Sequence, residues 1–275
     1  MFGHNEIVGK KFFAESPKAI AGKLLVTSLF HTIQGEGPFA GRPAAFVRLA
    51  KCNLQCDFCD TYFDSGDWLT AEEILERLEV LWWPHPGPDL LVVTGGEPTL
   101  QDASLRGLLH AAVGRGRFKD AQIESNGLMC SGPWPHGAVH VVSPKCVGNP
   151  PHYSEPPRAS LMTADCLKFV VSADAASPYH SVPAWALDWR ASMRREVFVS
   201  PMAEYNCEPE LTRATYLSRS APSIAKRSVA ERVSFWEPGL LDLEKCQRNH
   251  EHAAELAMQY GLRLSIQMQL LANLP

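Results

Sequence analysis

The sequence predicts an α/β protein built on a mostly parallel β-sheet that is either open or curled toward a barrel. Short apolar runs alternate with connecting segments, and most of the runs finish in polar residues. The run 90–93, Leu-Leu-Val-Val, contains no polar residue, as is typical of a strand buried on both faces of a parallel sheet. Helical spacing of apolar residues over 71–83 separates this run from an earlier one. In such sheets the ligand site lies at the carboxyl ends of the strands, so polar residues there are candidates for it.

The predicted elements follow one another in a regular order. Strands are expected at 24–30, 45–49, 90–93, 121–124, 139–143, 167–171, 197–200 and 262–267. Helices are expected from the capping box Thr70-Ala71-Glu72-Glu73 to Pro84, at 105–113, and from 240 to 260 before Gly261. A proline-rich loop at 148–158 and a mixed segment at 172–195 interrupt this order. We expect one domain over 1–275, with an N-terminal extension, 1–23, and an insertion, 172–195.

Composition indicates a protein that acts on a small molecule. The 275 residues carry 26 Lys and Arg against 30 Asp and Glu, and these charges are scattered. No basic face therefore favours binding to nucleic acid or to an anionic membrane. No run of eighteen apolar residues occurs and the first residues lack the apolar stretch of a signal peptide, so we expect a cytoplasmic protein. Disulfides are rare in that compartment, which leaves the cysteines available for chemistry.

Three of the eight cysteines lie close together on one predicted loop. Cys52, Cys56 and Cys59 follow a strand with the spacing C-x3-C-x2-C. One short loop can direct three such thiolates at a single inorganic centre. Three thiolates hold only three irons of a 4Fe-4S cluster. The fourth iron is then open to the amino and carboxylate groups of S-adenosylmethionine.

A structural role in the core, or a zinc site, would account for the three cysteines less well. Buried structural cysteines are common, but this loop also carries Asn53, Gln55, Asp57 and Asp60, which fit poorly in a core. Structural zinc usually takes four ligands, and no second cysteine pair or nearby histidine completes such a set.

A second motif, Gly95-Gly96-Glu97-Pro98, follows the run 90–93. By itself it would be an ordinary turn. After the cysteine loop, its missing side chains favour close approach of a ligand, here S-adenosylmethionine.

These two motifs resemble those of the radical S-adenosylmethionine superfamily, and neighbouring residues resemble its 7-carboxy-7-deazaguanine synthases. The matching segments, in order, are 30–37, 41–43, 46–49, 52–54, 59–61, 124–127, 143–145, 167–169 and 264–267. Gln34-Gly35-Glu36-Gly37 and Cys59-Asp60-Thr61 are the most specific of these. The resemblance extends over most of the chain from Leu25 onward.

The resemblance implies a reaction, a fold and a set of ligands. The reaction is contraction of 6-carboxy-5,6,7,8-tetrahydropterin to 7-carboxy-7-deazaguanine with loss of ammonia, on the route to queuosine and related deazapurines. The fold is a partial, modified (β/α) parallel barrel of the radical S-adenosylmethionine type. The implied ligands and partners are a 4Fe-4S cluster, S-adenosylmethionine, Mg²⁺, a flavodoxin-like or other reductant, and a second copy in a homodimer.

The residues expected to form the site fall into three groups. Metal ligands are Cys52, Cys56, Cys59 and Thr61. Contacts to S-adenosylmethionine are Phe58, Gly95, Gly96, Glu97, Glu124, Asn126, Ser143 and Lys145. Contacts to the pterin are Ile33, Gln34, Glu36, Arg48, Thr94, Gln269 and Pro275. Because the cofactor-derived radical abstracts the hydrogen, no side chain is assigned to that step.

Some of these roles also have a local chemical reason. Gln34 and Glu36 offer an amide and a carboxylate to the donor and acceptor edge of a pterin, although without the family resemblance a solvated loop would be favoured. Arg48 is a single charge in an apolar strand, so it needs an anion, either the substrate carboxylate or a structural acid. The Thr61 hydroxyl could complete an octahedral magnesium site or make an ordinary loop hydrogen bond.

Two positions depart from the family pattern. Lys51 stands before Cys52 where the family commonly has glycine. The segment Gln267-Met268-Gln269 stands where a histidine is usual, which bears on one expected substrate contact.

Two other functions share part of these features. A glycyl-radical activating enzyme has the same two motifs and acts on a protein partner, but it has no need of Gln34-Gly35-Glu36-Gly37. An iron-sulfur electron carrier is a non-enzymatic alternative, but it needs neither an incompletely ligated cluster nor a large parallel core.

Overall fold

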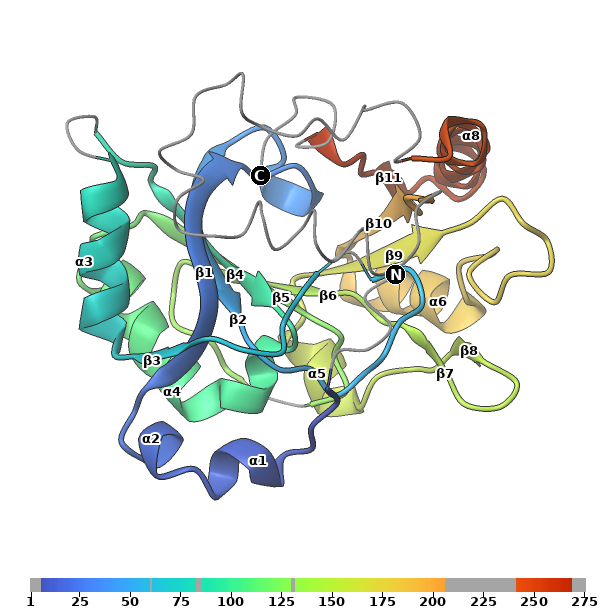
Figure 1. Cartoon of the computed structure of the whole chain (residues 1–275). Helices are drawn as coiled ribbons and strands as arrows, with labels where there is room; N and C mark the ends of the chain where they lie inside the picture. The colour runs from blue at the N-terminus through green and yellow to red at the C-terminus, as the bar shows by residue number, and fades with distance from the viewer. Residues whose placement is uncertain (1–5, 60, 83–85, 130–131, 206–240, 269–275) are drawn as a thin grey trace.

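The computed structural model describes residues 6–59, 61–82, 86–129, 132–205 and 241–268 (Figure 1). Within them, the main sheet has nine strands in the order β11-β10-β9-β6-β5-β4-β2-β1-β3. The strands from β2 through β11 in this order pair in parallel, which confirms the expected α/β fold class. Their bounds are β1 Leu24–Ile33, β2 Pro43–Leu49, β3 Asp67–Leu69, β4 Leu90–Gly95, β5 Asp120–Ser125, β6 Ala138–Val142, β9 Cys166–Val171, β10 Glu196–Pro201 and β11 Arg263–Leu264.

The first strand departs from the expected parallel order. β1 pairs antiparallel with β2, so that Ile33 lies opposite Pro43, the first residue of β2. The loop after β1 therefore begins at the amino edge of the parallel strands. Arg42 at the end of this loop pairs with Asp89 and Asp120, which stand at the starts of β4 and β5. The loop carrying Gln34 and Glu36 thus approaches the sheet from the edge opposite the cysteine loop, which follows the carboxyl end of β2.

Helices cover the outer face of the sheet (Figure 1). One apolar core lies where α3 and α4 pack on β2, β4 and β5. A second core lies where α5, α6 and α8 pack on β9 and β10. The bounds are α3 Ala71–Trp82, α4 Asp102–Leu109, α5 Arg158–Thr163, α6 Ala184–Met193 and α8 Leu243–Tyr260. No helix in the described ranges has both the length and the apolar character needed to cross a bilayer.

Local chemistry explains where the two best predicted helices begin and end. Thr70 and Glu73 form the expected capping box, with the Thr70 amide donating to the Glu73 carboxylate at 2.7 Å and the Glu73 amide donating to the Thr70 hydroxyl at 3.2 Å. The helix α3 ends at Trp82, and Pro84 lies outside the described residues. The helix α8 ends at Tyr260 and is capped by Gly261, whose φ of 63° places it in the left-handed region.

Several expected elements differ in length or kind. The last strand covers only Arg263–Leu264, because the chain leaves β10 after two paired residues. The helix expected at 105–113 is α4 followed by a π turn, His110–Gly114. The proline-rich loop contains part of a small hairpin formed by β7 Cys146–Val147 and β8 His152–Tyr153. The extension before Leu24 contains α1 Lys11–Ala14 and α2 Pro17–Ile20.

The inner face of the curved sheet has an apolar half and a polar half. Toward the amino edge, Ala44, Phe46, Leu90 and Val92 form a small apolar cluster. Phe39 of the short helix η1, Gly37–Phe39, packs against this cluster from the loop after β1. Polar residues replace apolar ones farther along the same strands. The fold therefore provides a cavity that is closed at the amino edge by a loop and bordered at the carboxyl edge by the cysteines.

Candidate active site

One cavity brings most of the expected site residues together. Its wall includes the three cysteines of the loop, the Thr94–Glu97 segment and polar residues from five parallel strands or the loops that follow them. The lining residues are Glu36, Cys52, Leu54, Cys56, Phe58, Cys59, Thr61, Phe63, Thr94, Gly95, Gly96, Glu97, Glu124, Ser125, Asn126, Ser143, Lys145, Lys168, Val170, Ser200, Pro201, Ala203 and Gln267. The cavity therefore runs from the cysteine loop to the loop that closes the inner face.

The cysteine loop has a donor set that fits an iron-sulfur cluster. The six cysteines in the described ranges are free thiols, and Cys52, Cys56 and Cys59 all line the cavity. Across the described residues, no three His, Cys, Asp or Glu side chains converge on one point as ligands of a single ion would. Thiolates of a cubane cluster bind different iron atoms, so three sulfurs spread along one wall fit that group. Burial raises the pKa of Cys52 to about 12, so binding iron there must release a proton.

Two glycines allow the cysteine loop to approach the end of β4. A side-chain carbon on Gly96 would stand 1.9 Å from the Lys51 carbonyl oxygen, and one on Gly95 would stand 2.2 Å from the Leu49 carbonyl oxygen. The backbone is joined here by bonds from the Gly96 amide to Leu49 and from the Glu97 amide to Lys51, both 2.9 Å. From the sequence, the missing side chains were expected to give a ligand access. The structure gives another reason for the glycines, because the backbone of residues 48–52 occupies the space where their side chains would lie.

The Glu97 side chain is held within the protein. It is 1% exposed, and its carboxylate accepts hydrogen bonds from the Thr99 amide at 3.0 Å and the Asn126 amide at 2.7 Å. Burial raises the pKa of this carboxyl although these hydrogen bonds oppose the shift. The Asn126 side chain in turn donates to Asn53 in the cysteine loop at 2.7 Å. Glu97 thus ties the ends of β4 and β5 together beside the cysteines.

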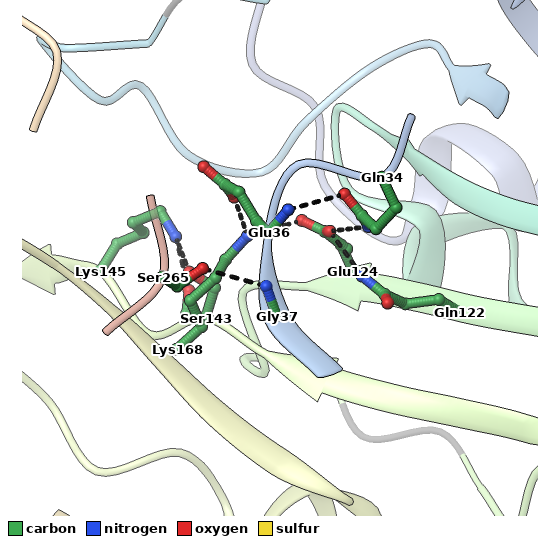
Figure 2. A network of polar contacts seen from close by, with 9 residues as sticks. All are labelled: Gln34, Glu36, Gly37, Gln122, Glu124, Ser143, Lys145, Lys168 and Ser265. Atoms are coloured by element: carbon green, nitrogen blue, oxygen red, sulfur yellow. Dashed lines mark hydrogen bonds and ion pairs between the residues drawn. The ribbon is translucent and has the colours of Figure 1, made fainter. Parts of the chain in front are cut away.

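Away from the cysteine loop, the cavity-lining residues Glu36, Glu124 and Lys168 form a polar floor together with Gln34 and Gln122 (Figure 2). The Lys168 ammonium donates to the Glu36 carboxylate and, at 2.9 Å, to the Glu124 carboxylate. Glu124 also accepts from the amides of Gln122 at 2.8 Å and Gln34 at 3.1 Å. The side-chain oxygen of Gln34 accepts from the Glu36 backbone amide at 3.1 Å. Each member of the floor is therefore fixed by at least one neighbour.

Burial and charge act in opposite directions on this floor. Burial alone would lower the pKa of Lys168, but the charges of Glu124 and Glu36 reverse the effect and raise it above its ordinary value. Burial would raise the pKa of Glu124, but Lys168 and the two amide donors hold it below its ordinary value. The lysine therefore stays charged and keeps a buried carboxylate ionised at neutral pH.

The loop after β1 is hydrogen-bonded to the segment that follows β11, at the far end of the sheet. The Gly37 amide donates to the Ser265 hydroxyl at 3.0 Å, and Ser265 directly follows β11 (Figure 2). The Met268 amide donates to the Gly35 carbonyl at 3.4 Å. A segment that begins beside β2 thereby reaches the last strand, and the curved sheet is bridged along its inner face.

The wall of the cavity contains a second lysine, Lys145. Lys145 donates to the Ser143 carbonyl and hydroxyl oxygens, both at 2.7 Å. Burial lowers the pKa of Lys145, while the nearby Cys56, Glu124 and Glu97 charges oppose that shift. On the cysteine loop, the Phe58 ring packs edge-on against Tyr179 of the 172–195 insertion, with centroids 5.0 Å apart. That insertion therefore supports the loop on the side of Phe58.

The structure places most, but not all, of the expected site residues at the cavity. Cys52, Cys56, Cys59, Thr61, Phe58, the Thr94–Glu97 segment, Glu124, Asn126, Ser143, Lys145 and Glu36 line the cavity. Gln34 reaches it only through Glu124 and Glu36. Ile33 stands at the end of β1, and Arg48 packs its guanidinium 5.1 Å from the Phe30 ring centroid. Gln269 and Pro275 lie outside the described residues.

Lys168, Ser200 and Gln267 also line the cavity, and none of them was assigned a specific role from the sequence. Lys168 could have been found, because it is a lone charge in the apolar strand Cys166–Val171, as Arg48 is in its own strand. Ser200 and Gln267 carry only the general signal of a polar residue at the end of a predicted strand.

Comparison with known proteins agrees with this geometry. Residues 47–136 match the family model described as the radical SAM superfamily. A 7-carboxy-7-deazaguanine synthase of Rhodospirillum rubrum is 37% identical over 187 residues, covering 67% of this chain and 71% of the relative. The synthase of Hyperthermus butylicus is 31% identical over 267 residues, covering 92% of this chain and 94% of the relative. The crystal structure of QueE from Escherichia coli has a similar fold, with a TM-score of 0.57, 20% identity, and coverage of 95% of this chain and 99% of that one.

The fold, the cysteine loop and the matched family model define a radical S-adenosylmethionine enzyme. Within this class, relatives that align over most of the chain share one name. The chain belongs to the 7-carboxy-7-deazaguanine synthase family. Membership decides against the glycyl-radical activating enzyme and the electron carrier.

The contact between Gly96 and Lys51 gives a first prediction. Gly96→Ala should sharply reduce iron content after anaerobic reconstitution and lower the thermal unfolding midpoint, because the added carbon would overlap the Lys51 carbonyl. Gly107→Ala is the matched control, since nothing lies within 4 Å of the carbon added in α4. Full iron content in the Gly96 variant would show that the two backbones are not in this contact.

Proposed function

We propose that this enzyme contracts 6-carboxy-5,6,7,8-tetrahydropterin to 7-carboxy-7-deazaguanine with release of ammonia, in queuosine and deazapurine biosynthesis. The observation that carries the proposal is the cavity, which has the three cysteines at one end and the floor of Glu36, Glu124 and Lys168 at the other. A radical generated beside the cysteines would meet a heterocycle whose position the floor fixes. Family membership supports the identity of the heterocycle.

Cys52, Cys56 and Cys59 would hold a 4Fe-4S cluster, and S-adenosylmethionine would lie next to it. When bound, these groups supply the electron and the carbon radical that abstracts hydrogen from the substrate. Lys145 and Ser143 present a cation and a hydroxyl on the same wall, which suits the carboxylate and ribose of S-adenosylmethionine. Asn126 fixes the adjoining strand end to the cysteine loop through Asn53. These side chains orient the cofactor.

The charges of the cavity favour one orientation of the pterin. The floor contains two carboxylates and one ammonium, so it carries one net negative charge. The aminopyrimidine edge of a pterin presents N–H donors, which ionised carboxylates accept. The substrate carboxylate would be repelled by the same floor and attracted to Arg48, which lies on β2 beside Thr94 of the cavity wall. Opposite preferences at the two ends of the substrate thus present one ring orientation to the cofactor.

The Thr61 hydroxyl would contribute to a magnesium site. Thr61 lines the cavity beside Cys59, whose thiol donates to the Thr61 carbonyl at 3.6 Å. Magnesium takes neutral and anionic oxygen ligands in octahedral geometry, and substrate oxygens and water can supply the others. Homodimeric assembly and a flavodoxin-like reductant are supported by the family resemblance alone, and the cytoplasmic location expected from the sequence stays a prediction.

Turnover with isotope-labelled substrate tests the function directly. Under anaerobic conditions with reductant and S-adenosylmethionine, substrate deuterated at carbon 6 should give 7-carboxy-7-deazaguanine. Deuterium should also pass into S-adenosylmethionine, because the rearrangement is redox neutral and the abstracted hydrogen can return. Mass spectrometry of both compounds measures this. Stoichiometric zinc in place of iron, or no deazapurine from a cluster-loaded enzyme, would contradict the proposal.

Replacing the lysine of the floor should alter substrate binding and its pH dependence. Lys168→Met leaves buried carboxylates without their cation, so we expect the KM for the pterin to rise about tenfold or more at pH 7. In the parent, Lys168 holds the pKa of Glu124 below its ordinary value, so the carboxylate stays ionised and KM should be flat from pH 6 to 8. In the variant, burial raises that pKa, the carboxylate takes up a proton as pH falls, and KM should rise at pH 6.

Two variants accompany this experiment. Lys119→Met removes an exposed lysine and should leave KM unchanged. Glu36→Gln keeps the Lys168–Glu124 pair and should raise KM with iron content preserved. If both Lys168→Met and Glu36→Gln keep the KM and the pH profile of the parent, the floor does not bind the substrate.

The magnesium proposal is tested by two substitutions at one position. Thr61→Ala should lower turnover and abolish its response to added magnesium, with iron content unchanged, because only a hydroxyl is lost. Thr61→Ser keeps the hydroxyl and should retain most of that response. If both variants respond to magnesium as the parent does, Thr61 is not a ligand.

A further inference from the structure

The residue before the first cysteine has a backbone conformation that few side chains adopt. Lys51 has a φ of 72°, in the left-handed region that favours glycine. Its amide donates to the Phe63 carbonyl at 2.6 Å, and its carbonyl accepts from the Glu97 amide at 2.9 Å. These two bonds fix the peptide between the cysteine loop and the segment after β4. A lysine there has a steric cost that glycine would not have.

The Lys51 side chain is held by the N-terminal extension. It is 8% exposed, and its ammonium pairs with the Glu6 carboxylate. The same ammonium lies 5.5 Å from the centroid of the Phe12 ring. A nearly buried ammonium needs such partners, since water cannot solvate it fully. Both partners come from one short segment, residues 6–13, which we call the N-terminal arm.

The N-terminal arm also contacts the first cysteine through its backbone. The Val8 amide donates to the Cys52 carbonyl at 2.9 Å, next to a parallel bridge between Ile7 and Cys52. Val8 and Phe13 are buried in an apolar cluster with Leu25, Ala50 and Leu100. The arm is therefore anchored in its own small core and adds an outer backbone bond to Cys52, the first of the proposed cluster ligands.

We propose that the N-terminal arm is a clamp that holds Cys52 in its ligating position, with Lys51 as the latch. Glu6 and Phe12 hold the Lys51 side chain, and this offsets the cost of the left-handed backbone at that residue. The arm is then part of the scaffold of the cluster. The proposal rests on the proposed function only in taking Cys52 as a cluster ligand.

A latch at Lys51 implies a specific coupling between that residue and the arm. Replacing Glu6 or Phe12 should then reduce iron retention only when residue 51 is a lysine. Lys51→Gly removes the latch and the steric cost together, so it should retain iron within about twofold of the parent. In that background the arm substitutions should have no further effect on iron retention. Independent sites would instead give equal effects in both backgrounds.

The experiment measures iron loss from the full-length, cluster-loaded protein to an iron(II) chelator, with the cluster's spin-resonance signal followed in parallel. Glu6→Gln with Phe12→Ala should speed iron loss roughly fivefold when Lys51 is present and leave it unchanged with Lys51→Gly, as for a coupling of about 1 kcal/mol. Glu15→Gln makes the same charge change nearby and should behave as the parent. Equal acceleration in both backgrounds, or none in either, would overturn the latch.

A second readout separates this proposal from the proposed function. Hydrogen exchange at the amides of Lys51 and Glu97 in cluster-free protein reports the same junction without iron, because those amides bond to Phe63 and to Lys51. The arm substitutions should speed exchange there with Lys51 and leave it unchanged with Lys51→Gly. A parent that binds no iron but shows this pattern would refute the cluster and support the latch. If the arm substitutions leave the exchange rates of these amides unchanged when Lys51 is present, the proposal for Lys51 is refuted and the proposed function is unaffected.

Discussion

The site depends on one buried cation. Lys168 is placed in the middle of β9 on the inner face of the sheet, where an unpaired ammonium would be costly. Glu124 of β5 supplies one carboxylate, and Glu36 of the loop after β1 supplies the other. This second carboxylate draws the loop from the amino edge into the curve of the sheet. The loop then closes one end of the cavity and joins β1, β5, β9 and the segment after β11 (Figure 2).

The opposite end of the cavity is set by backbone packing. Gly95 and Gly96 let the end of β4 lie against the carbonyls of Leu49 and Lys51 at distances that no side chain would permit. The cysteine loop is thereby directed over the cavity. Glu97 and Asn126 extend this contact to the end of β5. Charge therefore positions the floor and close backbone contact positions the cysteine loop, and β5, which carries Glu124 and leads to Asn126, connects the two.

Much of the fold was predictable because short sequence patterns determine where helices and strands begin and end. The capping box at Thr70 and the glycine at 261 mark helix ends by hydrogen bonds that need no distant partner. The antiparallel pairing of β1 was not predictable in this way, since its apolar run does not show the direction of its neighbour. The brief last strand was not predictable either, because its length depends on how far it follows β10.

The site residues also fall into two groups, those with a local sequence signal and those whose role depends on distant residues. The cysteine spacing and the glycines of 95–96 are local signals, and both lie at the cavity. The role of Lys168 depends on Glu36, which is 132 residues away, so a lone charge in a strand indicated only that a partner exists. The departure at Lys51 was visible, but its meaning required the left-handed φ of that residue and the contacts of the N-terminal arm.

The central claim is that the substrate lies between the cysteine loop and the floor, with its aminopyrimidine edge on Glu36 and Glu124. An anaerobic crystal structure of the cluster-loaded enzyme with S-adenosylmethionine and 6-carboxy-5,6,7,8-tetrahydropterin measures this directly. The account predicts N–H groups of that edge within hydrogen-bonding distance of the floor, and the substrate carboxylate directed toward Arg48. A pterin bound outside this cavity, or bound with its carboxylate against the floor, would contradict it.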